Sequence, residues 1–344
     1  MKYICFAASP LHLICIKELA SLHEEDCFVI YCFVQDRSNI LYKQIIRTIE
    51  LLDLGNVIEV VMPKTKVIQV VRRFMLAYCL FYKYKGQLTT FVILDFRNTF
   101  MHFLRRLFPD SKFILIDDGF ATYEAYHRYM KNGYFLPYLQ YRGVLGSVNR
   151  YIHFGSNFNC LLHKEIDVFT IYARELGLSV GSYNDLRFIR KLSEATMLDY
   201  SDTLVYFAGA RLAEKGVLTM EEEIQLIVKV NDYWAEKGKK MIYVGKRVTR
   251  GTMSEKKMKC IEGKSIPIIF FDLPLELALI ESKPKKIPTT ICSFGSTLNT
   301  TLPMMYQNMD AYLVEIDDVI KRSSKCGAGD VKDTQIEVKK ILCK

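Results

Sequence analysis

Short apolar runs alternate with amphipathic segments through the first third of the chain. The runs lie at 3–7, 27–33, 57–61, 90–94 and 112–116, and the segments between them, 10–22, 39–52, 67–84 and 99–107, have helical apolar spacing. Strands that are buried on both faces have continuous apolar runs, and their alternation with helices is typical of a parallel sheet covered on both sides. We therefore predict a doubly wound α/β domain in this half.

A second alternating block begins near residue 203. Its apolar runs at 204–207, 240–244, 266–271, 289–293 and 311–314 predict strands, and 221–237, 274–280 and 296–307 predict helices. Between the blocks, 120–158 is rich in Tyr and predicts a long loop with short helices, which is often a functional kind of segment. The predicted fold class is α/β, with two doubly wound Rossmann-like domains, 1–190 and 191–329, facing across a cleft. A C-terminal helix over 330–344 would pack back on the first domain. This architecture is called GT-B.

Composition narrows the classes of function. The 344 residues are 50% hydrophobic and carry a formal net charge of +9, which favours anionic partners such as phosphorylated substrates or an anionic membrane. No nucleic-acid-binding motif occurs, so nucleic acid is not an expected partner. The ten Cys are scattered without a Cys-x-x-Cys pair. They indicate buried thiols in a reducing compartment and not a disulfide framework or a metal site.

The N-terminal apolar run differs from a signal peptide. Pro10 and His12 interrupt it, and Lys17 and Glu18 follow it without a small-residue cleavage site. No run reaches the roughly 18 uninterrupted apolar residues that a membrane span needs. We therefore expect a cytoplasmic protein, soluble or peripheral to a membrane.

Residues that directly follow the predicted strands are the candidates for a site, because ligands of open α/β sheets bind beyond the carboxyl ends of strands. Ser9 follows the first strand and could cap the next helix or contact a ligand, with His12 close behind. Arg97 and Asn98 follow the fourth strand. Asn98 could cap a helix, and Arg97 could bind a carboxylate or a phosphate.

Asp117, Asp118 and Gly119 follow the fifth strand, where four apolar residues lead to two adjacent carboxylates. Gly119 permits a sharp turn, and repulsion between the carboxylates could raise one pKa towards the range of a general base. An ordinary turn and a metal site are the other readings, but no nearby carboxylate or His completes a metal shell.

The second half offers glycines, cations and hydroxyls at strand ends. Gly209 and Glu214 follow the strand 204–207. Lys246 and Arg247 follow the strand 240–244, where they either contact a phosphate or belong to a solvated basic turn. Two further strand ends open helices through their N-termini, which favour anions. The candidates in them are Asp272, Pro274, Glu276, Ser293, Gly295, Ser296 and Thr297.

Taken in order, these segments resemble bacterial sialyltransferases, most closely glycosyltransferase family 52, over most of the chain. Segment 6–12 looks like the family's first strand with its Ser-Pro-Leu end, and 116–119 is similar to the acidic-acidic-Gly motif of several such families. Segments 207–218 and 272–276 resemble the Leu-Gly-Gln-Pro segment and the Pro-x-Glu element, whose Glu approaches the nucleotide ribose. Segment 293–298 is similar to the Ser/Thr motif that holds the CMP phosphate.

The resemblance implies a metal-independent transferase without a cofactor. It would move a sialic-acid-like nonulosonic acid (sialic, pseudaminic or legionaminic) from a CMP-activated donor to a hydroxyl of a bacterial surface glycan. Asp117 or Asp118 would be the general base, with Glu214 as a second candidate. The acceptor or donor-sugar side would comprise Ser9, His12, Arg97, Asn98 and Gly119. The nucleotide and its phosphate would be bound by Gly209, Lys246, Arg247, Asp272, Pro274, Glu276, Ser293, Gly295, Ser296 and Thr297.

One departure from the family concerns the donor. These enzymes usually carry a His-Pro pair after the second strand of the C-terminal domain, where this chain has Lys246 and Arg247 and where no His follows. Either cation could replace the charge, but neither changes protonation near neutrality as His does. A hexosyltransferase of the same fold that uses a UDP-sugar is therefore the alternative.

A third hypothesis belongs to another class: a non-catalytic, membrane-associated protein of polysaccharide assembly. The basic clusters and the aromatic segment 74–84 motivate it, although a buried core explains that segment more simply. For the transferase, the expected partners are the CMP-sugar and an oligosaccharide or lipid-linked glycan acceptor. Peripheral association with the inner face of the bacterial inner membrane and a homodimer are left open.

Overall fold

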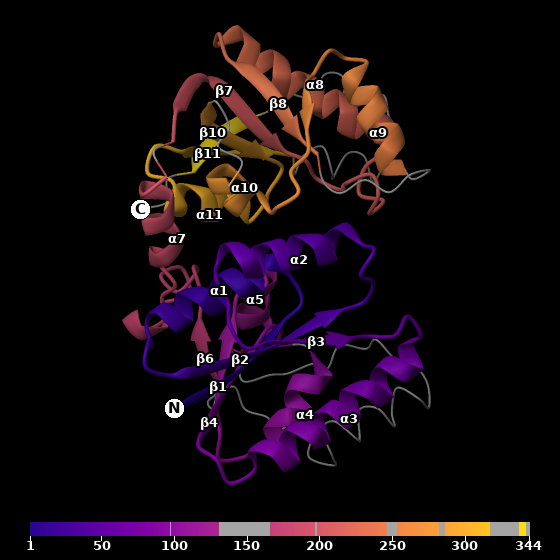
Figure 1. The fold of residues 1–344 in the computed structure, drawn as a ribbon. Helices are drawn as coiled ribbons and strands as arrows, with labels where there is room; N and C mark the ends of the chain where they lie inside the picture. The colour runs from indigo at the N-terminus through magenta and orange to yellow at the C-terminus, as the bar shows by residue number, and fades with distance from the viewer. Residues whose placement is uncertain are drawn as a thin grey trace. The chain divides into compact units, whose positions relative to one another are not determined.

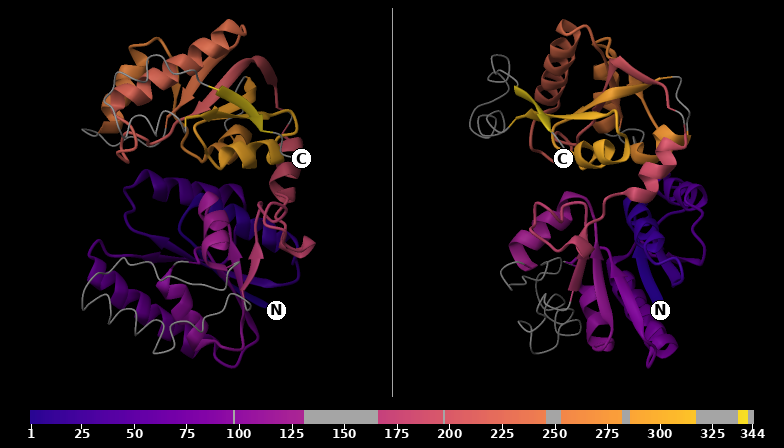
Figure 2. Two further views of the ribbon diagram at one scale, coloured as in Figure 1. Left: turned by 180° about the vertical axis from the view of Figure 1, so that it is seen from behind. Right: turned by 90° about the vertical axis from the view of Figure 1, so that its left-hand side faces the viewer.

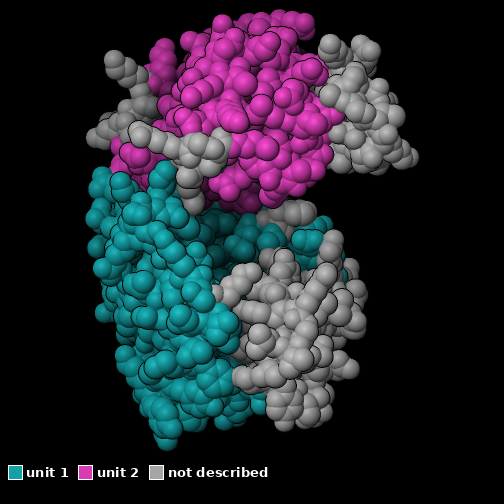
Figure 3. All heavy atoms as spheres, turned by 90° about the vertical axis from the view of Figure 1, so that its right-hand side faces the viewer, with its two compact units in different colours: residues 1–188 teal, residues 189–344 magenta. Residues whose placement is uncertain are grey.

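The computed structural model describes residues 1–96, 98–130, 166–196, 198–245, 253–281, 286–316 and 337–341. The chain divides into two compact units, Met1–Phe188 (unit 1) and Ile189–Lys344 (unit 2), which Figure 3 colours separately. Each unit contains one six-stranded sheet. The expected α/β class with two doubly wound, largely parallel sheets is confirmed.

Unit 1 has a fully parallel sheet in the order β3-β2-β1-β4-β5-β6. Its strands are β1 (Lys2–Ala7), β2 (Cys27–Val34), β3 (Val57–Val61), β4 (Thr89–Ile93), β5 (Lys112–Ile116) and β6 (Ile166–Phe169). Its helices include α1 (Pro10–Ser21), α2 (Ile40–Leu51), α3 (Lys66–Tyr84), α4 (Thr99–Leu107) and α5 (Phe120–Ala125), followed by a π-helix, η1 (Tyr126–Met130), and a short 3-10 helix, η4 (Val180–Ser182). Helix α7 (Arg187–Glu194) spans the boundary between the two units.

The alternation of side chains along β1 builds two cores in unit 1. Ile4 and Phe6 pack in the core beneath α3 and α4, whereas Cys5 and Ala7 pack in the core beneath α1 and α2. Successive side chains of a strand point to opposite faces, so a continuous apolar run buries both. Figure 1 shows α1 and α2 on one side of the sheet and α3 and α4 on the other.

Unit 2 has the sheet order β12-β11-β10-β7-β8-β9, in which only β12 is antiparallel to its neighbour. Its strands are β7 (Tyr200–Ala208), β8 (Lys240–Val244), β9 (Ile268–Ile269), β10 (Ile287–Ser293), β11 (Asp310–Glu315) and β12 (Glu337–Ile341). Its helices include α8 (Met220–Glu236), α9 (Met253–Glu262), α10 (Leu275–Glu281) and α11 (Leu298–Met305). Each sheet with its covering helices can be followed from two further directions in Figure 2.

The core of unit 2 beneath α8 and α9 contains Trp234, the single Trp of the chain. Its indole is 2% exposed and meets the ring of Tyr312 edge-to-face, with 5.0 Å between the ring centroids. Offset and edge-to-face contacts are the favoured geometries of aromatic pairs. In Figure 1, α10 and α11 lie on the opposite side of this sheet from α8 and α9.

The two sheets share one topology. Counted within each unit, the described strands follow the order 3-2-1-4-5-6, and the chain reverses direction across the sheet between β1 and β4 and between β7 and β10. In doubly wound folds such a reversal is the point where ligands bind. The fold therefore marks one candidate region in each unit.

The C-terminal helix expected over 330–344 is wrong for the part that the structure describes. Glu337–Ile341 instead forms β12, which pairs antiparallel with β11 in the sheet of unit 2. Val338 and Ile341 favour an extended backbone, and the Lys residues between them suit an edge strand, where charge discourages further pairing. The boundary between the two units lies between residues 188 and 189, two residues before the expected domain boundary between 190 and 191.

Candidate functional site

Asp117 lies directly after β5 and is completely buried. Because β5 and β6 are in register, Thr170 follows β6 beside it. The Thr170 hydroxyl donates to Asp117 Oδ1, and the N–H of Ile171 donates to Oδ2 at 2.9 Å. Burial raises the pKa of Asp117 to about 7, with a further contribution from Asp118, against the lowering effect of those two hydrogen bonds. Asp117 thus joins β5 to β6 and has no exposed surface for a substrate.

Asp118 faces the other way, with 39% of its side chain exposed. Its Oδ1 lies 3.2 Å from Nε2 of His12, whose own side chain is buried. The N–H of Ala8 donates to Nδ1 of His12 at 3.1 Å, so the ring proton is placed on Nε2, facing Asp118. The imidazole therefore orients the carboxylate while leaving part of it open.

Gly119 makes the turn that separates the two carboxylates. Its φ of 66° lies in the left-handed region that favours glycine, and it precedes α5. The Thr122 hydroxyl accepts the N–H of Asp118 at 2.8 Å, which fixes the backbone at this point. The two neighbouring side chains therefore diverge, and of the pair Asp118 faces outward.

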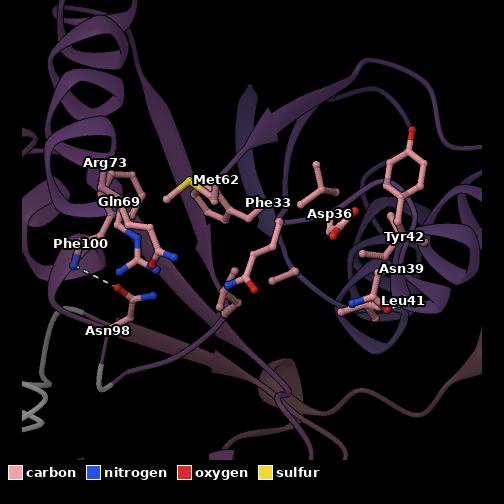
Figure 4. Close-up of a pocket in the computed structure, with 15 residues that line it drawn as sticks. Phe33, Asp36, Asn39, Leu41, Tyr42, Met62, Gln69, Arg73, Asn98 and Phe100 are labelled. Carbon is pink, nitrogen blue, oxygen red and sulfur yellow. Dashed lines mark hydrogen bonds between the residues drawn. The ribbon is translucent and has the colours of Figure 1, made fainter. Parts of the chain in front are cut away.

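A pocket of about 230 Å³ opens at the carboxyl ends of β1 to β4 in unit 1. Figure 4 shows Gln69, Arg73 and Asn98 at one end and Asp36, Asn39 and Tyr42 at the other, with Phe33 and Met62 between them. Amide, guanidinium and carboxylate groups around an apolar floor are the lining expected for a polar organic ligand. Ala8 lines this pocket and also bonds His12, so the pocket adjoins the Asp118 site.

The other unit 1 candidates are caps. Ser9 caps α1, accepting the N–H of His12 at 3.4 Å, and Asn98 caps α4, accepting the N–H of Phe100 at 3.0 Å. Asn98 also lines the pocket, so its side chain can both cap α4 and contact a ligand. Arg97 lies outside the described residues.

In unit 2, the ends of β7 and β10 lie side by side, because Ala208 pairs with Ser293. Gly209 follows β7, and a Cβ there would overlap the Tyr243 ring, whose Cζ would be 2.7 Å away. This close approach gives Gly209 a packing reason independent of any ligand. Because β7 and β10 are neighbouring strands, the segment that follows β10 begins next to Gly209.

In the segment 293–297, the Ser293 side chain is fixed by hydrogen bonds within the protein, whereas the hydroxyls of Ser296 and Thr297 can still donate to a ligand. The Ser293 hydroxyl is buried and bonded to Asn299 Oδ1 at 3.1 Å and to the N–H of Gly295 at 3.1 Å. Ser296 accepts the N–H of Leu298 at 3.3 Å, and Thr297 makes no side-chain cap bond. Gly295, at φ 99°, lets the chain turn into α11. Ser296 and Thr297 therefore retain hydroxyl protons that a phosphate could accept.

Glu276 reaches the same region from α10. Its Oε1 accepts from the Thr301 hydroxyl at 3.3 Å, which also bonds the carbonyl of Thr297. Burial raises the pKa of Glu276 against the lowering effect of its hydrogen bonds. Pro274 precedes α10, and Asp272 is exposed in the loop before it. The structure thus brings Gly209, 293–297 and Glu276 together at the reversal point.

Glu214 lies in a different environment from the one expected for a base. Its Oε2 accepts from Lys257 Nζ at 2.9 Å and its Oε1 from the Ser254 hydroxyl at 2.8 Å. Lys257 is buried, and it also donates to the Ala210 carbonyl and to Glu223, each at 2.9 Å. Burial alone would raise the pKa of Glu214, but the Lys257 and Ser254 bonds lower it. Both oxygens are therefore engaged in holding the segment after β7.

Lys246 and Arg247, the substitutes for the missing His, lie outside the described residues. Within the described ranges, no group of three or more His, Cys, Asp or Glu side chains is arranged to hold a metal ion.

Sequence reasoning missed the pocket and the buried lysine. Gln69 and Arg73 are four residues apart on α3, so they share a face, but the same pattern occurs on many solvated helices. Lys257 stands in the run Lys256-Lys257-Met258-Lys259, where nothing local distinguishes the buried cation from its exposed neighbours.

No protein-family model and no curated protein matches this chain. Among solved structures, one similar chain is from Listeria monocytogenes and is assigned in its description as a UDP-N-acetylglucosamine 2-epimerase. It has 11% identity and a TM-score of 0.50, over 88% of this chain and 76% of that one. A UDP-GlcNAc 2-epimerase from Methanocaldococcus jannaschii has 11% identity and a TM-score of 0.46, over 90% of this chain and 83% of that one. The likeness to the Listeria protein shows a shared GT-B-like fold, with two parallel-dominated sheets.

Proposed function

We propose that the chain is a nucleotide-sugar-dependent glycosyltransferase in which Asp118 is the general base. The observation that carries this proposal is the divergence of the two carboxylates after β5. Asp117 is buried and bonded on both oxygens, whereas Asp118 is partly exposed and oriented by His12. A base must contact the proton that it removes, and only Asp118 of the pair can meet an acceptor hydroxyl.

In the proposed reaction, Asp118 takes the proton of the acceptor hydroxyl as its oxygen bonds to the anomeric carbon of the donor sugar. The bond from that carbon to the phosphate oxygen breaks, and its electron pair leaves with the nucleotide. His12, held by the N–H of Ala8, acts as a positioning residue for the carboxylate. The adjoining pocket, with Asn98 and Gln69, would bind the acceptor glycan.

Unit 2 would bind the nucleotide. Ser296 and Thr297, at the start of α11, would donate to the departing phosphate, and the positive end of the helix dipole would stabilise its charge. Glu276 would accept from ribose hydroxyls. The resemblance to family 52 favours CMP and a sialic-acid-like sugar, while a UDP-sugar remains the alternative because a protein of similar fold is described as acting on one.

The base assignment is tested by Asp118→Asn. General acid–base catalysis contributes roughly 10²–10⁴-fold, so kcat should fall by about that factor while KM changes little. Asp110→Asn, at an exposed position before β5, is the control and should leave kcat unchanged. Full turnover by Asp118→Asn with a true donor would refute the assignment.

The role of His12 is tested by two variants. His12→Ala should lower kcat by about tenfold, because the Asp118 carboxylate loses its orienting donor, and His12→Gln should restore part of the rate. The pH profile of kcat should also change in His12→Ala. If both variants lower only thermal stability, His12 has a structural role alone.

The donor is tested by a panel of CMP, UDP and their sugars. A bound nucleotide raises the free energy of unfolding, by roughly 2.7 kcal/mol at a hundredfold excess over Kd, and so raises the midpoint of thermal unfolding. Stabilisation by CMP alone supports the nonulosonic donor, and stabilisation by UDP alone supports a hexosyltransferase. Conversion of UDP-GlcNAc without any acceptor would replace the transferase with an isomerase. Failure of every nucleotide to bind would favour the non-catalytic alternative.

A further inference from the structure

Helix α3 is apolar on two faces. Ala77, Leu80 and Tyr84 are buried in the core of unit 1. An opposite row is exposed: Val67 63%, Val71 52%, Met75 64%, Tyr78 40% and Tyr82 71%. Spacings of four, four, three and four residues place this row along one side of the helix. The buried-core explanation of the aromatic segment 74–84 therefore covers only half of α3.

Exposed apolar side chains are concentrated around this row and are not spread evenly over the described surface. Of the 16 large apolar side chains that are exposed in the described part of the chain, seven lie between 67 and 88. They are Val67, Ile68, Val71, Met75, Tyr78, Tyr82 and Leu88. Scattered exposed apolar residues need no explanation, but a contiguous apolar row marks an interaction surface.

The charge around this row has one sign. Between Glu59 and Asp95 the sequence contains no acidic residue and six basic ones. The six are Lys64, Lys66, Arg72, Arg73, Lys83 and Lys85. Arg72, Lys83 and Lys85 are exposed on or directly after α3, whereas Lys64, which precedes the helix, pairs with Asp36 at 3.4 Å. Lys85 also lies over the Tyr82 ring, 5.7 Å from its centroid, so the cation and the aromatic group are presented together.

An apolar helix face flanked by Lys and Arg, with Tyr at its C-terminal end, has the composition of a helix that lies in a membrane interface. A protein interface would instead be depleted of Lys. Within the described ranges, no helix has both the length and the apolarity to cross a bilayer. Anionic headgroups would complement the charge of the exposed Arg72, Lys83 and Lys85, which lie in a stretch of sequence without acidic residues.

We propose that α3 binds the surface of an anionic bilayer, with Val67, Val71 and Met75 inserted at the level of the headgroups. Gln69 and Arg73, on another face of the same helix, line the unit 1 pocket, so docking would place that pocket close to the membrane. A lipid-linked acceptor would then reach it from the bilayer. This last consequence rests on the proposed function, whereas the docking itself does not.

Flotation of the full chain with lipid vesicles tests the docking. We expect co-flotation with vesicles of phosphatidylcholine and phosphatidylglycerol, weaker binding to phosphatidylcholine alone, and weakening by salt. Replacing Val71 and Met75 together by Glu should lower the partition coefficient at least about tenfold, since both apolar contacts are lost. Arg72→Gln should lower it about fivefold, as expected for one cation near an anionic surface.

Val180→Glu is the matched control, because Val180 is 94% exposed in unit 1 but lies outside α3. It should bind like the unchanged chain. All variants change exposed positions, so equal midpoints of thermal unfolding confirm that they fold. Absence of binding to anionic vesicles, or equal binding by the doubly substituted chain, would overturn the proposal. A dimer in light scattering that the double substitution abolishes would assign the face to a second copy instead.

Discussion

Two acidic clusters, one in each unit, stand at strand ends and are built in opposite ways. In unit 2, Lys257 lies between Glu214 and Glu223 and holds both carboxylates through charge-assisted bonds. In unit 1, Asp117 and Asp118 are contacted by a hydroxyl, a backbone amide and an imidazole. The contrast teaches that a cation at the centre commits carboxylates to architecture, whereas neutral donors leave one of them available for chemistry.

The largest expected effect comes from removing the central cation. Lys257→Met should lower the free energy of unfolding by about 3–5 kcal/mol, because two buried or half-buried carboxylates lose their partner. Urea unfolding measures it. Lys259→Met, on the same helix but 73% exposed, should change stability by less than about 0.5 kcal/mol. A loss below about 1 kcal/mol in Lys257→Met would remove the basis of the comparison.

Asp117→Asn should have the next largest effect, about 1–3 kcal/mol at low pH, because an amide cannot accept from both donors. The effect should depend on pH. The folded-state pKa, about 7, lies above the unfolded value of 3.8, so the folded form binds the proton more tightly. The resulting stabilisation is complete below the unfolded pKa and is lost as pH rises through about 7.

Unfolding measured from about pH 4 to about pH 8 should therefore show the original chain losing stability relative to Asp117→Asn as pH rises. A constant difference would mean that Asp117 does not titrate in this range in the folded state.

Glu214→Gln should have the smallest effect. The amide oxygen can still accept from Lys257, so stability should fall by only about 1 kcal/mol. If the carboxylate serves architecture, kcat should stay within about twofold of the original. A loss of kcat comparable to that expected for Asp118→Asn would make Glu214 the catalytic group and reverse the assignment of the two clusters.

Strands and helices were predictable wherever apolar periodicity was long. The predicted limits of β3, β5, β8 and α4 coincide with the observed ones. For β5 and β8 the reason is local, since polar or small residues bound both strands. Glu337–Ile341 was not predicted as a strand, since its short Lys-rich pattern becomes extended only through pairing with β11. Tertiary context overrides local propensity most readily in such short segments.

The candidate site was predictable in position but not in detail. The rule of strand ends located Asp117, Asp118 and the segment 293–297, but not which carboxylate would be buried. That outcome depends on Thr170, which is 53 positions away in sequence and lies beside Asp117 because β5 pairs with β6. Likewise, nothing near Glu214 in sequence indicates that a lysine of α9 would neutralise it. Contacts between distant segments leave no local pattern to read.

The burial of Trp234 makes the two units distinguishable by spectroscopy. As the single Trp of the chain lies in the core of unit 2, tryptophan emission reports the environment of that unit alone. Circular dichroism, in contrast, sums the helices of both. Two unfolding curves that separate by these probes would give each unit its own stability, and a ligand that shifts only the emission curve would be assigned to unit 2 without any labelling.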